Sequence, residues 1–460
     1  MPLLDPRDPR PVHFVGIAGA GMSALAELFV RRGVRVTGCD AAAGAADDLR
    51  RLGIEVSEGH DAAHVAGARA LVVSSAIPRQ HPELEAARQH GIDVVRRAEA
   101  LGEAVGVGTL VAVAGTHGKT TTTVMTTEAL AAAGLAPTGV VGGRVGSWGG
   151  NLHHGSDELF VVEADEYDRS FLALTPQVAV VTNVEADHLD IYEDLADIRA
   201  TFERFLAPAH TIVLCDDDPG AASLDVTTGA QVMRYGISSE AARVRGTPAR
   251  LTDGRTAVAV TFDGECLGDV VLRVPGAHNV RNALAAMASG LALGATVEGM
   301  RPGLERFGGV ERRFQRLGSV GGVEVVDDYA HHPTELAATL AAARGAFPGR
   351  RLIAAFQPHL FSRTRDFAGD FAEALAGADV VFLSSIYPSR ERPIEGVSAS
   401  LIAAPLARAG RPPAWTGERH ALAEALAGAV REGDVVLTLG AGDITRTGPE
   451  LLQRLTASGA

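Results

Sequence analysis

Short apolar runs alternate with helical stretches through the N-terminal part of the chain. The pattern predicts a helix at about residues 22–32, and a stretch of small residues and glycine at about 98–108 indicates a domain boundary. Strand, helix and strand in this order are typical of a parallel sheet. The strands predicted in this part are residues 12–16, 35–39 and 70–74.

The middle of the chain begins in the same way and then changes its pattern. A threonine-rich helix that ends at Gly134 follows the first strand, and a later helix is expected at 278–293. From about 231 to 274 the runs are short and alternating, with turn signals at 252–254 and 263–264, which predicts antiparallel hairpins. The buried strands expected before the hairpins are 109–114, 159–162, 178–182 and 211–215.

From about residue 310 the alternation of strands and helices returns, with strands expected at 323–327, 351–356, 380–383 and 435–439. The predicted fold class is therefore α/β with three domains. We expect a Rossmann-like N-terminal domain at 1–104 and a Rossmann-like C-terminal domain at 310–460. Between them, at 105–309, we expect a P-loop ATPase-type parallel sheet that carries antiparallel hairpins.

Composition narrows the class of protein. Of the 460 residues, 46% are hydrophobic and 21% are charged, which argues against a largely disordered, collagen-like or coiled-coil chain. The net charge is -14, without the excess of basic residues that nucleic-acid-binding proteins carry, so we expect no nucleic-acid partner. No run approaches the roughly 20 apolar residues of a membrane span, so no membrane insertion is expected. Cys39, Cys215 and Cys266 are too far apart for a disulfide framework or a CxxC metal site, which favours a cytoplasmic protein.

Residues 115–122 read GTHGKTTT, directly after the strand at 109–114 and directly before a helix. In such a loop backbone N–H groups point at phosphate oxygens, the lysine reaches the terminal phosphates, and a hydroxyl can ligate magnesium. The strict consensus has a glycine where this chain has Val113, but the strand, the Gly-Lys-Thr core and the helix remain. We therefore expect nucleotide binding by Gly115, Thr116, His117, Gly118, Lys119, Thr120 and Thr121.

Lysine occurs once, at position 119, among 42 basic side chains, so all the others are arginine. A composition that avoids lysine this strongly indicates that position 119 needs a compact ammonium rather than a planar guanidinium. Chance survival of one lysine is the alternative, and the loop around Lys119 argues against it.

Polar side chains also follow the next two predicted strands. Glu163 comes directly after the run at 159–162, and Asp187 and His188 follow the strand at 178–182. Because the carboxyl ends of parallel strands meet at one edge of a sheet, we expect these residues near the phosphates. Magnesium prefers carboxylate and phosphate oxygens, which makes Glu163 the natural ligand and His188 a less orthodox one. The alternative is that Glu163, Asp165, Glu166 and Asp168 form a solvated acidic turn.

Three glycines, Gly16, Gly19 and Gly21, open the first helix, and Asp40 ends the second strand about twenty residues later. Read as Gly19-x-Gly21-x-x-Ala24, the segment nearly satisfies the dinucleotide fingerprint with an acidic ribose partner. The pattern predicts a pyrophosphate-binding turn, without distinguishing NAD from a sugar nucleotide. A tight structural turn is the other interpretation.

Further polar clusters lie near the end of the central domain and after strands of the third. Each has a structural alternative, since Asn279 could cap a helix, Arg312 could be a surface charge and His332 could be an ordinary loop histidine. Together they are expected to line a second wall of a crevice. The clusters are His278, Asn279 and Asn282; Arg312, Arg313 and Phe314; Asp327, Asp328, Tyr329, His331 and His332; and Gln357, His359 and Arg363.

In combination these motifs resemble the bacterial Mur ligases. The matches occur in order and extend through all three predicted domains. The matching segments are GIAGAGMSALAE at 16–27, SSAI at 74–77, GTHGKTTT at 115–122, EADEYD at 163–168, TNVEADHLD at 182–190, HNVRNA at 278–283, DDYAHHPTE at 327–335, FQPHLFSR at 356–363 and LGAGD at 439–443.

The resemblance implies an ATP-dependent amide ligase of peptidoglycan precursor synthesis, with Mg²⁺ as cofactor, that joins L-alanine to the lactyl carboxylate of UDP-N-acetylmuramate. The three domains would bind the UDP sugar, ATP and the amino acid in that order. The residues implied are Gly19, Ala20, Gly21, Met22, Asp40, Ser75 and Ala76 for the UDP sugar; Asn279 and Asn282 for adenine; Arg313 and Tyr329 for ATP; Thr120, Glu163 and His188 for magnesium; His332, His359 and Arg363 for the amino acid; and Lys119, Arg313 and His332 for catalysis.

Some family members have an arginine directly after the histidine of FQPH, where this chain has Leu360, so one of their carboxylate contacts is not implied here. Two alternatives remain at this point. One is the recycling ligase of the same family, which adds a preformed tripeptide and resembles FEPR where this chain has FQPH. The other is an NAD-dependent oxidoreductase built on Gly19, Gly21 and Asp40, which leaves the loop at Lys119 unexplained.

Overall fold

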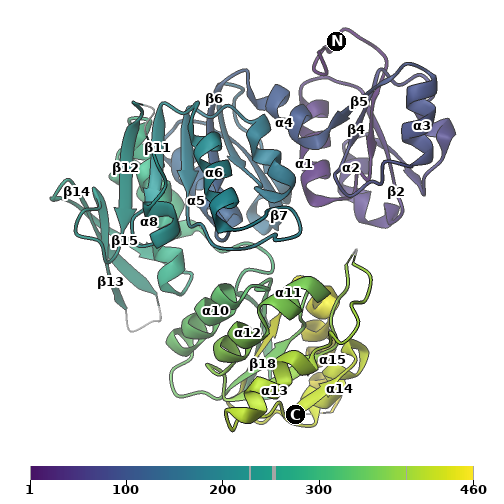
Figure 1. Cartoon of the computed structure of the whole chain (residues 1–460). Coiled ribbons are helices and arrows are strands. Elements are labelled where there is room, and N and C mark those ends of the chain that lie inside the picture. Colours follow the sequence, from purple (N-terminus) through teal and green to yellow (C-terminus); the bar gives the residue numbers. More distant parts are fainter. Residues whose placement is uncertain (1, 227–228, 251–254, 390, 459–460) are drawn as a thin grey trace. The chain divides into compact units, whose positions relative to one another are not determined.

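The computed structural model describes residues 2–226, 229–250, 255–389 and 391–458 (Figure 1). The chain forms two compact units. The first unit holds residues 1–249, 257–271 and 280–307, and the second holds residues 250–256, 272–279 and 308–460. Within the described part of the chain, no helix is both long and apolar enough to cross a bilayer.

The N-terminal sheet of the first unit is parallel, with strand order β3-β2-β1-β4-β5. The order reverses at β1, and ligands bind at the carboxyl ends of strands beside such a switch point. The strands are β1 (Val12–Val15), β2 (Val36–Asp40), β3 (Glu55–Glu58), β4 (Ala70–Val73) and β5 (Asp93–Arg96). The helices are α1 (Ala20–Arg31), α2 (Asp47–Arg51), α3 (Pro82–Gln89) and α4 (Arg97–Val105), with 3₁₀ turns η1 (Ala43–Ala46) and η2 (Ala62–Val65).

The second sheet of the first unit has ten strands in the order β15-β14-β13-β12-β11-β10-β6-β9-β7-β8. Its strands are β6 (Thr109–Ala114), β7 (Thr138–Val145), β8 (Gly150–His153), β9 (Leu159–Glu163), β10 (Val178–Val181), β11 (Thr211–Cys215), β12 (Gln231–Gly236), β13 (Val244–Arg250), β14 (Thr256–Phe262) and β15 (Glu265–Leu272). The accompanying helices are α5 (Lys119–Ala132), α6 (Leu195–Leu206), α7 (Pro219–Ala222), α8 (Ala277–Ala292) and α9 (Val297–Arg306), with 3₁₀ turns η3 (Gly146–Trp148) and η4 (Tyr167–Ala173).

The predicted hairpin region is only partly antiparallel. β12 pairs in parallel with both β11 and β13, so it extends the parallel sheet and the hairpins begin after it. β14 and β15 are joined by Asp263 and Gly264, whose φ angles are 49° and 84°. Positive φ at both central residues is the geometry of a primed two-residue hairpin turn, as the Asp-Gly signal predicted. The other predicted turn, at 252–254, lies outside the described residues.

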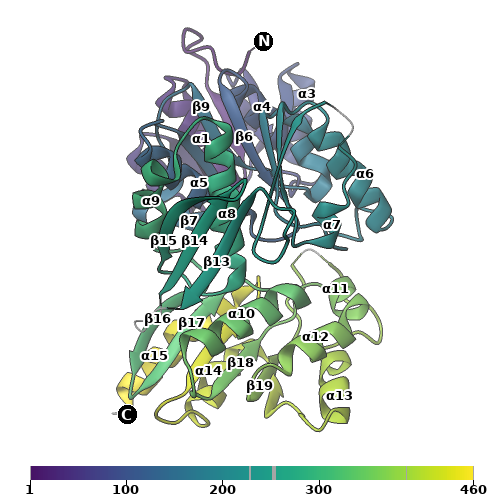
Figure 2. The same cartoon turned by 90° about the vertical axis from the view of Figure 1, so that its left-hand side faces the viewer.

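The sheet of the second unit has the order β16-β17-β21-β18-β19-β20 and is parallel except for the edge strand β16. One buried cluster packs α10, α12 and α13 on one face of the sheet, and another packs α14 and α15 on the opposite face (Figure 2). The strands are β16 (Gln315–Val320), β17 (Val323–Asp328), β18 (Leu352–Phe356), β19 (Val380–Ser384), β20 (Trp415–Gly417) and β21 (Val435–Leu439). The helices are α10 (Pro333–Ala346), α11 (Phe361–Asp366), α12 (Ala368–Leu375), α13 (Ser400–Arg408), α14 (Arg419–Ala427) and α15 (Thr447–Ala457), with the 3₁₀ turn η5 (Asp443–Arg446).

Candidate active site

The glycine-rich loop lies between the buried strand β6 and helix α5, as predicted. Gly118, at the N-cap of α5, has φ 80°, and Gly115 has φ 134°. A Cβ atom on Gly115 would lie 2.0 Å from Thr182 Oγ1, and one on Gly118 would lie 2.8 Å from Asn282 Oδ1. Only glycine fits at these two positions, because both the backbone conformation and the space exclude a side chain. The contact also places Asn282 directly against the loop.

The ammonium of Lys119 is held on the loop by oxygen acceptors. Nζ donates to the carbonyl of Gly115 at 2.7 Å, to that of Thr116 at 3.2 Å and to Glu166 Oε1 at 2.9 Å. Burial, the largest single effect, lowers the pKa of Lys119, but the carboxylates of Glu166, Asp165 and Glu163 together outweigh it and the net shift is upward. Lys119 therefore carries its positive charge at neutral pH, at the N-terminus of a fourteen-residue helix. This combination suits an anionic phosphate.

The predicted metal ligands fall into two contacting groups. Thr120 Oγ1 donates to Glu163 Oε1 at 2.7 Å, and the other carboxylate oxygen of Glu163 accepts from the backbone of Gly142 at 2.6 Å. His188 has φ 53°, and its Nε2 lies 3.5 Å from Glu166 Oε1. Glu166 therefore links His188 to Lys119.

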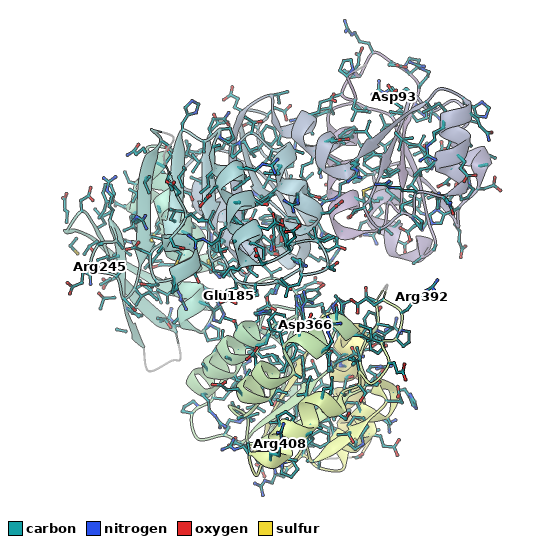
Figure 3. All side chains as sticks on the ribbon, in the orientation of Figure 1. Asp93, Glu185, Arg245, Asp366, Arg392 and Arg408 are labelled. Atoms are coloured by element: carbon teal, nitrogen blue, oxygen red, sulfur yellow. The ribbon has the colours of Figure 1, made fainter. Side chains whose placement is uncertain are left out.

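Loop residues after β10 hold the glycine-rich loop from the other side. Thr182 Oγ1 donates to the carbonyl of His117 at 2.6 Å, and Asn183 Oδ1 accepts from the backbone N–H of His117 at 2.7 Å. The imidazole of His117 lies 3.2 Å from the carboxylate of Glu185, which Figure 3 labels. The backbone of His117 is thus fixed by the loop after β10, a contact that the sequence pattern did not predict.

The glycine turn of the N-terminal sheet is tied to the end of β2. Gly16 has φ 79° and donates to the carbonyl of Cys39 at 2.9 Å. One carboxylate oxygen of Asp40 accepts from the backbone N–H of Ala18 and the other from that of Ala42, both at 2.9 Å. Asp40 therefore shapes the turn, in addition to any contact with a nucleoside. The predicted residues Ser75 and Ala76 follow β4, which lies beside β1, so all three loops share one edge of the sheet.

A cavity of about 350 Å³ lies beside this turn, within the first unit. It extends from the start of α1 to the segment between β7 and β8, and the ion pair between Arg144 and Asp48, at 2.5 Å, lies at it. Polar and charged lining residues make it suited to a charged ligand rather than an apolar one. Its lining includes Ala18, Ala20, Ser23, Arg144, Trp148 and Asn151.

In the second unit, the end of β17 carries a cluster of cationic and aromatic groups. The guanidinium carbons of Arg312 and Arg313 lie 4.7 and 5.0 Å from the ring centroid of Tyr329. Arg312 also donates to the carbonyl of Gly440 at 2.8 Å, so it acts mainly in holding loops together. Arg313 Nη1 lies 3.6 Å from Glu335 Oε1 and is about one-third exposed.

His332, His359 and Arg363 belong to the same unit. His332 is the buried N-cap of α10, where its Nδ1 accepts from the backbone N–H of Thr334 at 3.4 Å. This contact gives His332 a structural function at the start of the helix, in line with the alternative to a substrate-binding role. Arg363 is only 6% exposed, and its Nη1 lies 3.4 Å from His359 Nδ1. Leu360 between them has φ 68°, a conformation that L-residues rarely adopt.

Three family profiles match successive parts of the chain. The profile described as "Mur ligase family, catalytic domain" matches residues 11–107 and the "Mur ligase middle domain" matches residues 113–290. The profile described as "Mur ligase, glutamate ligase domain" matches residues 312–442.

Curated relatives match almost the whole chain. A protein of Salinibacter ruber named UDP-N-acetylmuramate--L-alanine ligase is 45% identical over 456 residues, which are 98% of this chain and 96% of that protein. A protein of the same name from Acidothermus cellulolyticus is 46% identical over 451 residues, 96% of this chain and 94% of that protein. The chain belongs to the Mur ligase family.

The fold of this Mur ligase is also that of a solved relative. The crystal structure of a UDP-N-acetylmuramate-alanine ligase from Thermotoga maritima matches it with a TM-score of 0.83 and 29% identity, covering 98% of this chain and 100% of the other. The predicted three-domain α/β class is thus confirmed. The boundaries after residues 104 and 309 remain predictions.

The side chains of this Mur ligase fit the magnesium ion that the family resemblance implies. A hydroxyl, a carboxylate and a nearby imidazole lie at the N-terminus of α5, and oxygen donors are what Mg²⁺ prefers. Thr120 and Glu163 are already in hydrogen-bond contact, so both side chains would be available to hold the ion. The fit is best for Thr120 and Glu163, because His188 faces Glu166.

Two residues of this Mur ligase that matter for the site were not among its predicted members. Glu166, only 3% exposed, was predicted only as part of a solvated turn, yet it is the ion-pair partner of Lys119 at 2.8 Å. Glu391 was not singled out at all, and its carboxylate accepts from the backbone N–H groups of Phe361 and Ser362 at the start of α11. The only sequence signal for Glu166 was its place in EADEYD, and Glu391 had none.

The buried carboxyl of Asp328, in the second unit of this Mur ligase, has a raised pKa that can be measured. Burial raises its pKa from 3.8 to about 6, although Arg313 and the N–H groups of Ala330 and Phe314 lower it. Because the folded pKa is the higher one, the contribution of Asp328 to the unfolding free energy is full below pH 3.8 and is lost as pH rises through 6. We expect carboxyl carbon NMR to give Asp328 a midpoint near pH 6. Asp379, whose pKa Arg344 lowers, should titrate below 3.8, and a similar midpoint for Asp328 would contradict this account.

Proposed function

We propose that this Mur ligase joins L-alanine to the lactyl carboxylate of UDP-N-acetylmuramate in peptidoglycan precursor synthesis, with ATP as co-substrate. The observation that carries the proposal is full-length similarity, at 45 and 46% identity, to relatives named for this reaction. The phosphate-binding loop with Lys119 supports ATP use, and it argues against an oxidoreductase built on the N-terminal turn alone. We also place the enzyme in the cytoplasm, where its free cysteines would stay reduced.

The chemistry explains why ATP is needed. A carboxylate is a poor acyl donor, so one of its oxygens attacks the γ-phosphorus of ATP and ADP leaves, which gives an acyl phosphate. The alanine amine then attacks the acyl carbon, phosphate leaves and the amide forms. In phosphoryl transfer the protein acts mainly by positioning and by stabilising charge.

We assign the roles of the residues on this basis. Lys119, charged and held at the N-terminus of α5, would bind the terminal phosphates, and Arg313 would add charge from the second unit. Thr120 and Glu163, with His188, would hold Mg²⁺, which when bound neutralises phosphate charge. Asn282 packs against the loop and would approach the nucleotide together with Asn279.

The remaining assignments concern the two other substrates. The turn from Gly19 to Met22, with Asp40, Ser75 and Ala76, shares an edge of the N-terminal sheet and would bind the UDP sugar. The paired His359 and Arg363 form a cationic site that suits a small carboxylate, and His332 lies at the start of the neighbouring helix α10.

Replacing Glu163 by alanine should weaken magnesium-dependent ATP use much more than UDP-sugar binding. The carboxylate contacts Thr120 at the phosphate loop, whereas the UDP-sugar residues belong to another sheet. We expect ATP affinity measured by calorimetry with Mg²⁺ to fall by about tenfold or more. The exposed Glu158, just before the same strand β9, provides the control Glu158→Ala. Equal loss of both ligands in Glu163→Ala would contradict the assignment.

The amino-acid substrate is tested by identifying the product. The enzyme is incubated with Mg²⁺, ATP and UDP-N-acetylmuramate, together with either L-alanine or the recycling tripeptide, and the products are analysed by mass spectrometry. We expect the alanine adduct. If the tripeptide is joined and alanine is not, the chain is the recycling ligase.

A further inference from the structure

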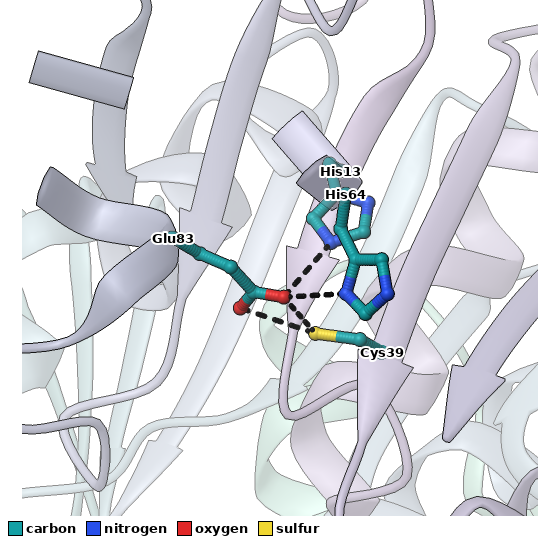
Figure 4. Close-up of side chains that lie close together, drawn as sticks. All are labelled: His13, Cys39, His64 and Glu83. Carbon is teal, nitrogen blue, oxygen red and sulfur yellow. Dashed lines mark hydrogen bonds and ion pairs between the residues drawn. The ribbon is translucent and has the colours of Figure 1, made fainter. Parts of the chain in front are cut away.

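A mostly buried group of side chains of types that can bind metals lies at the N-terminal sheet of the first unit, and the proposed ligase reaction does not use it. The carboxylate of Glu83, at the start of α3, is completely buried. Around it lie His13 from β1, Cys39 from β2 and His64 from η2 (Figure 4). One ligand atom from each of the four residues lies within 4.8 Å of all the others.

The distances from Glu83 Oε1 to the other three ligand atoms are close to the spacing that one ion would need. Cys39 Sγ lies 3.0 Å and His64 Nδ1 lies 2.8 Å from Glu83 Oε1, and His13 Nε2 lies 4.0 Å from the same oxygen. In a tetrahedral zinc site with bonds of about 2.0–2.3 Å, neighbouring ligand atoms are roughly 3.3–3.8 Å apart. Shifts of well under 1 Å per side chain would therefore bring the four atoms into a coordination shell.

An unpartnered nitrogen of His13 is an independent indication that a ligand binds between these side chains. Its side chain is only 2% exposed, and its Nδ1 is 2.9 Å from the hydroxyl of Thr37, while its Nε2 has no hydrogen-bond partner among the residues that the structure describes. With the proton on Nδ1, Nε2 presents a lone pair to the anionic carboxylate of Glu83. Metal-ligating histidines have this arrangement, in which the second nitrogen donates to a fixed partner.

Two more imidazoles approach the other oxygen of Glu83. His60 Nδ1 is 3.4 Å and His81 Nδ1 is 3.6 Å from Glu83 Oε2. Within the described part of the chain, the buried Nδ1 of His81 also has no hydrogen-bond partner. One carboxylate is thus surrounded by four histidines and a thiol. Nitrogen and sulfur donors of this kind select zinc and related late transition metals over magnesium.

We propose that His13, Cys39, His64 and Glu83 bind one Zn²⁺ ion or a similar transition metal at a closed structural site. Binding transfers the Cys39 thiol proton to solvent, and the thiolate and the carboxylate then balance the two positive charges of the ion. The four ligands come from β1, β2, η2 and α3, so the ion would join these elements beneath the glycine turn. The proposal stands apart from the ligase reaction and its magnesium.

The test uses cobalt as a spectroscopic probe. The full chain without an affinity tag is stripped with chelator and titrated with Co²⁺. We expect one equivalent to give tetrahedral d–d bands and a near-ultraviolet band from thiolate-to-cobalt charge transfer. A magnesium-type oxygen site cannot give the second band. Elemental analysis after Zn²⁺ loading and dialysis should give one zinc per chain, and zinc should raise the unfolding midpoint by several degrees.

Two variants and one control complete the test. Cys39→Ser should abolish the charge-transfer band, and His64→Gln, which changes a partly exposed ligand, should lower cobalt affinity by about tenfold or more. Cys215→Ser changes a buried cysteine of the central sheet and should leave spectrum and affinity unchanged. The proposal is wrong if the stripped wild-type chain gives no thiolate band, or if Cys39→Ser retains the band.

Discussion

Replacing Lys119 by arginine is expected to abolish ligase turnover while leaving the chain folded. The ammonium fits among the carbonyls of Gly115 and Thr116 and the carboxylate of Glu166, at 2.7 to 3.2 Å. A planar guanidinium is larger and directs its N–H groups differently, so it cannot take the same position among backbone groups. We expect no measurable phosphate release, and activity above about a tenth of wild type would contradict the proposed role.

The control for this variant is UDP-sugar binding, which should be unchanged in calorimetry because the N-terminal turn lies on a different sheet.

The same role of Lys119 can be tested by chemical modification, without a mutation. Since Lys119 is the only lysine, an amine reagent can modify only this side chain and the N-terminus. Magnesium and ATP should protect Lys119 from modification, and unchanged labelling in their presence would contradict phosphate binding there.

Replacing Arg363 by alanine should raise the KM for L-alanine by about 10- to 100-fold, the range expected for loss of a charged hydrogen bond to a carboxylate. Arg363 is buried against His359, so it offers a fixed cationic group rather than a mobile surface charge. The KM for ATP should stay nearly constant. Arg363→Lys should restore part of the alanine affinity, because lysine keeps the positive charge but lacks the paired N–H donors of the guanidinium.

Arg365 provides a matched control on the same helix. It is more than half exposed and pairs with Asp366 at 2.7 Å, so Arg365→Ala should leave both KM values unchanged. Steady-state kinetics of the three variants checks the assignment. If Arg363→Ala raises the KM for ATP and for alanine together, its effect is on the fold of the second unit and the proposed carboxylate contact is wrong.

Local sequence patterns predicted much of the fold. The strands at 109–114, 211–215 and 435–439 have the predicted bounds, because each is a mainly apolar run between polar or glycine residues. The other strands given explicit bounds differ by one residue at one end, or at both ends for β2. Six further strands, β3, β5, β7, β8, β16 and β20, were not predicted. The pairing of β12 was not predictable in this way, since alternation along one strand does not tell whether its neighbour runs parallel or antiparallel.

The candidate site likewise contains residues that the sequence pattern predicted and residues that it did not. Gly115, Gly118 and Lys119 were predictable because their spacing on a strand, loop and helix carries the chemistry. Glu166 was not, because it lies in the irregular segment after β9, where no strand or helix spacing directs a side chain toward Lys119. No spacing rule could bring His13, Cys39, His64 and Glu83 together, since they meet only after the parallel sheet has formed.

The central claim, amide formation through an acyl phosphate, is tested most directly by following one oxygen atom. UDP-N-acetylmuramate with both oxygens of its lactyl carboxylate isotopically labelled is incubated with Mg²⁺, ATP and L-alanine, and the phosphate and the amide are quantified by mass spectrometry. We expect one phosphate per amide, one labelled oxygen in each phosphate, and little phosphate release when alanine is left out. Unlabelled phosphate, or equal phosphate release without alanine, would contradict the account.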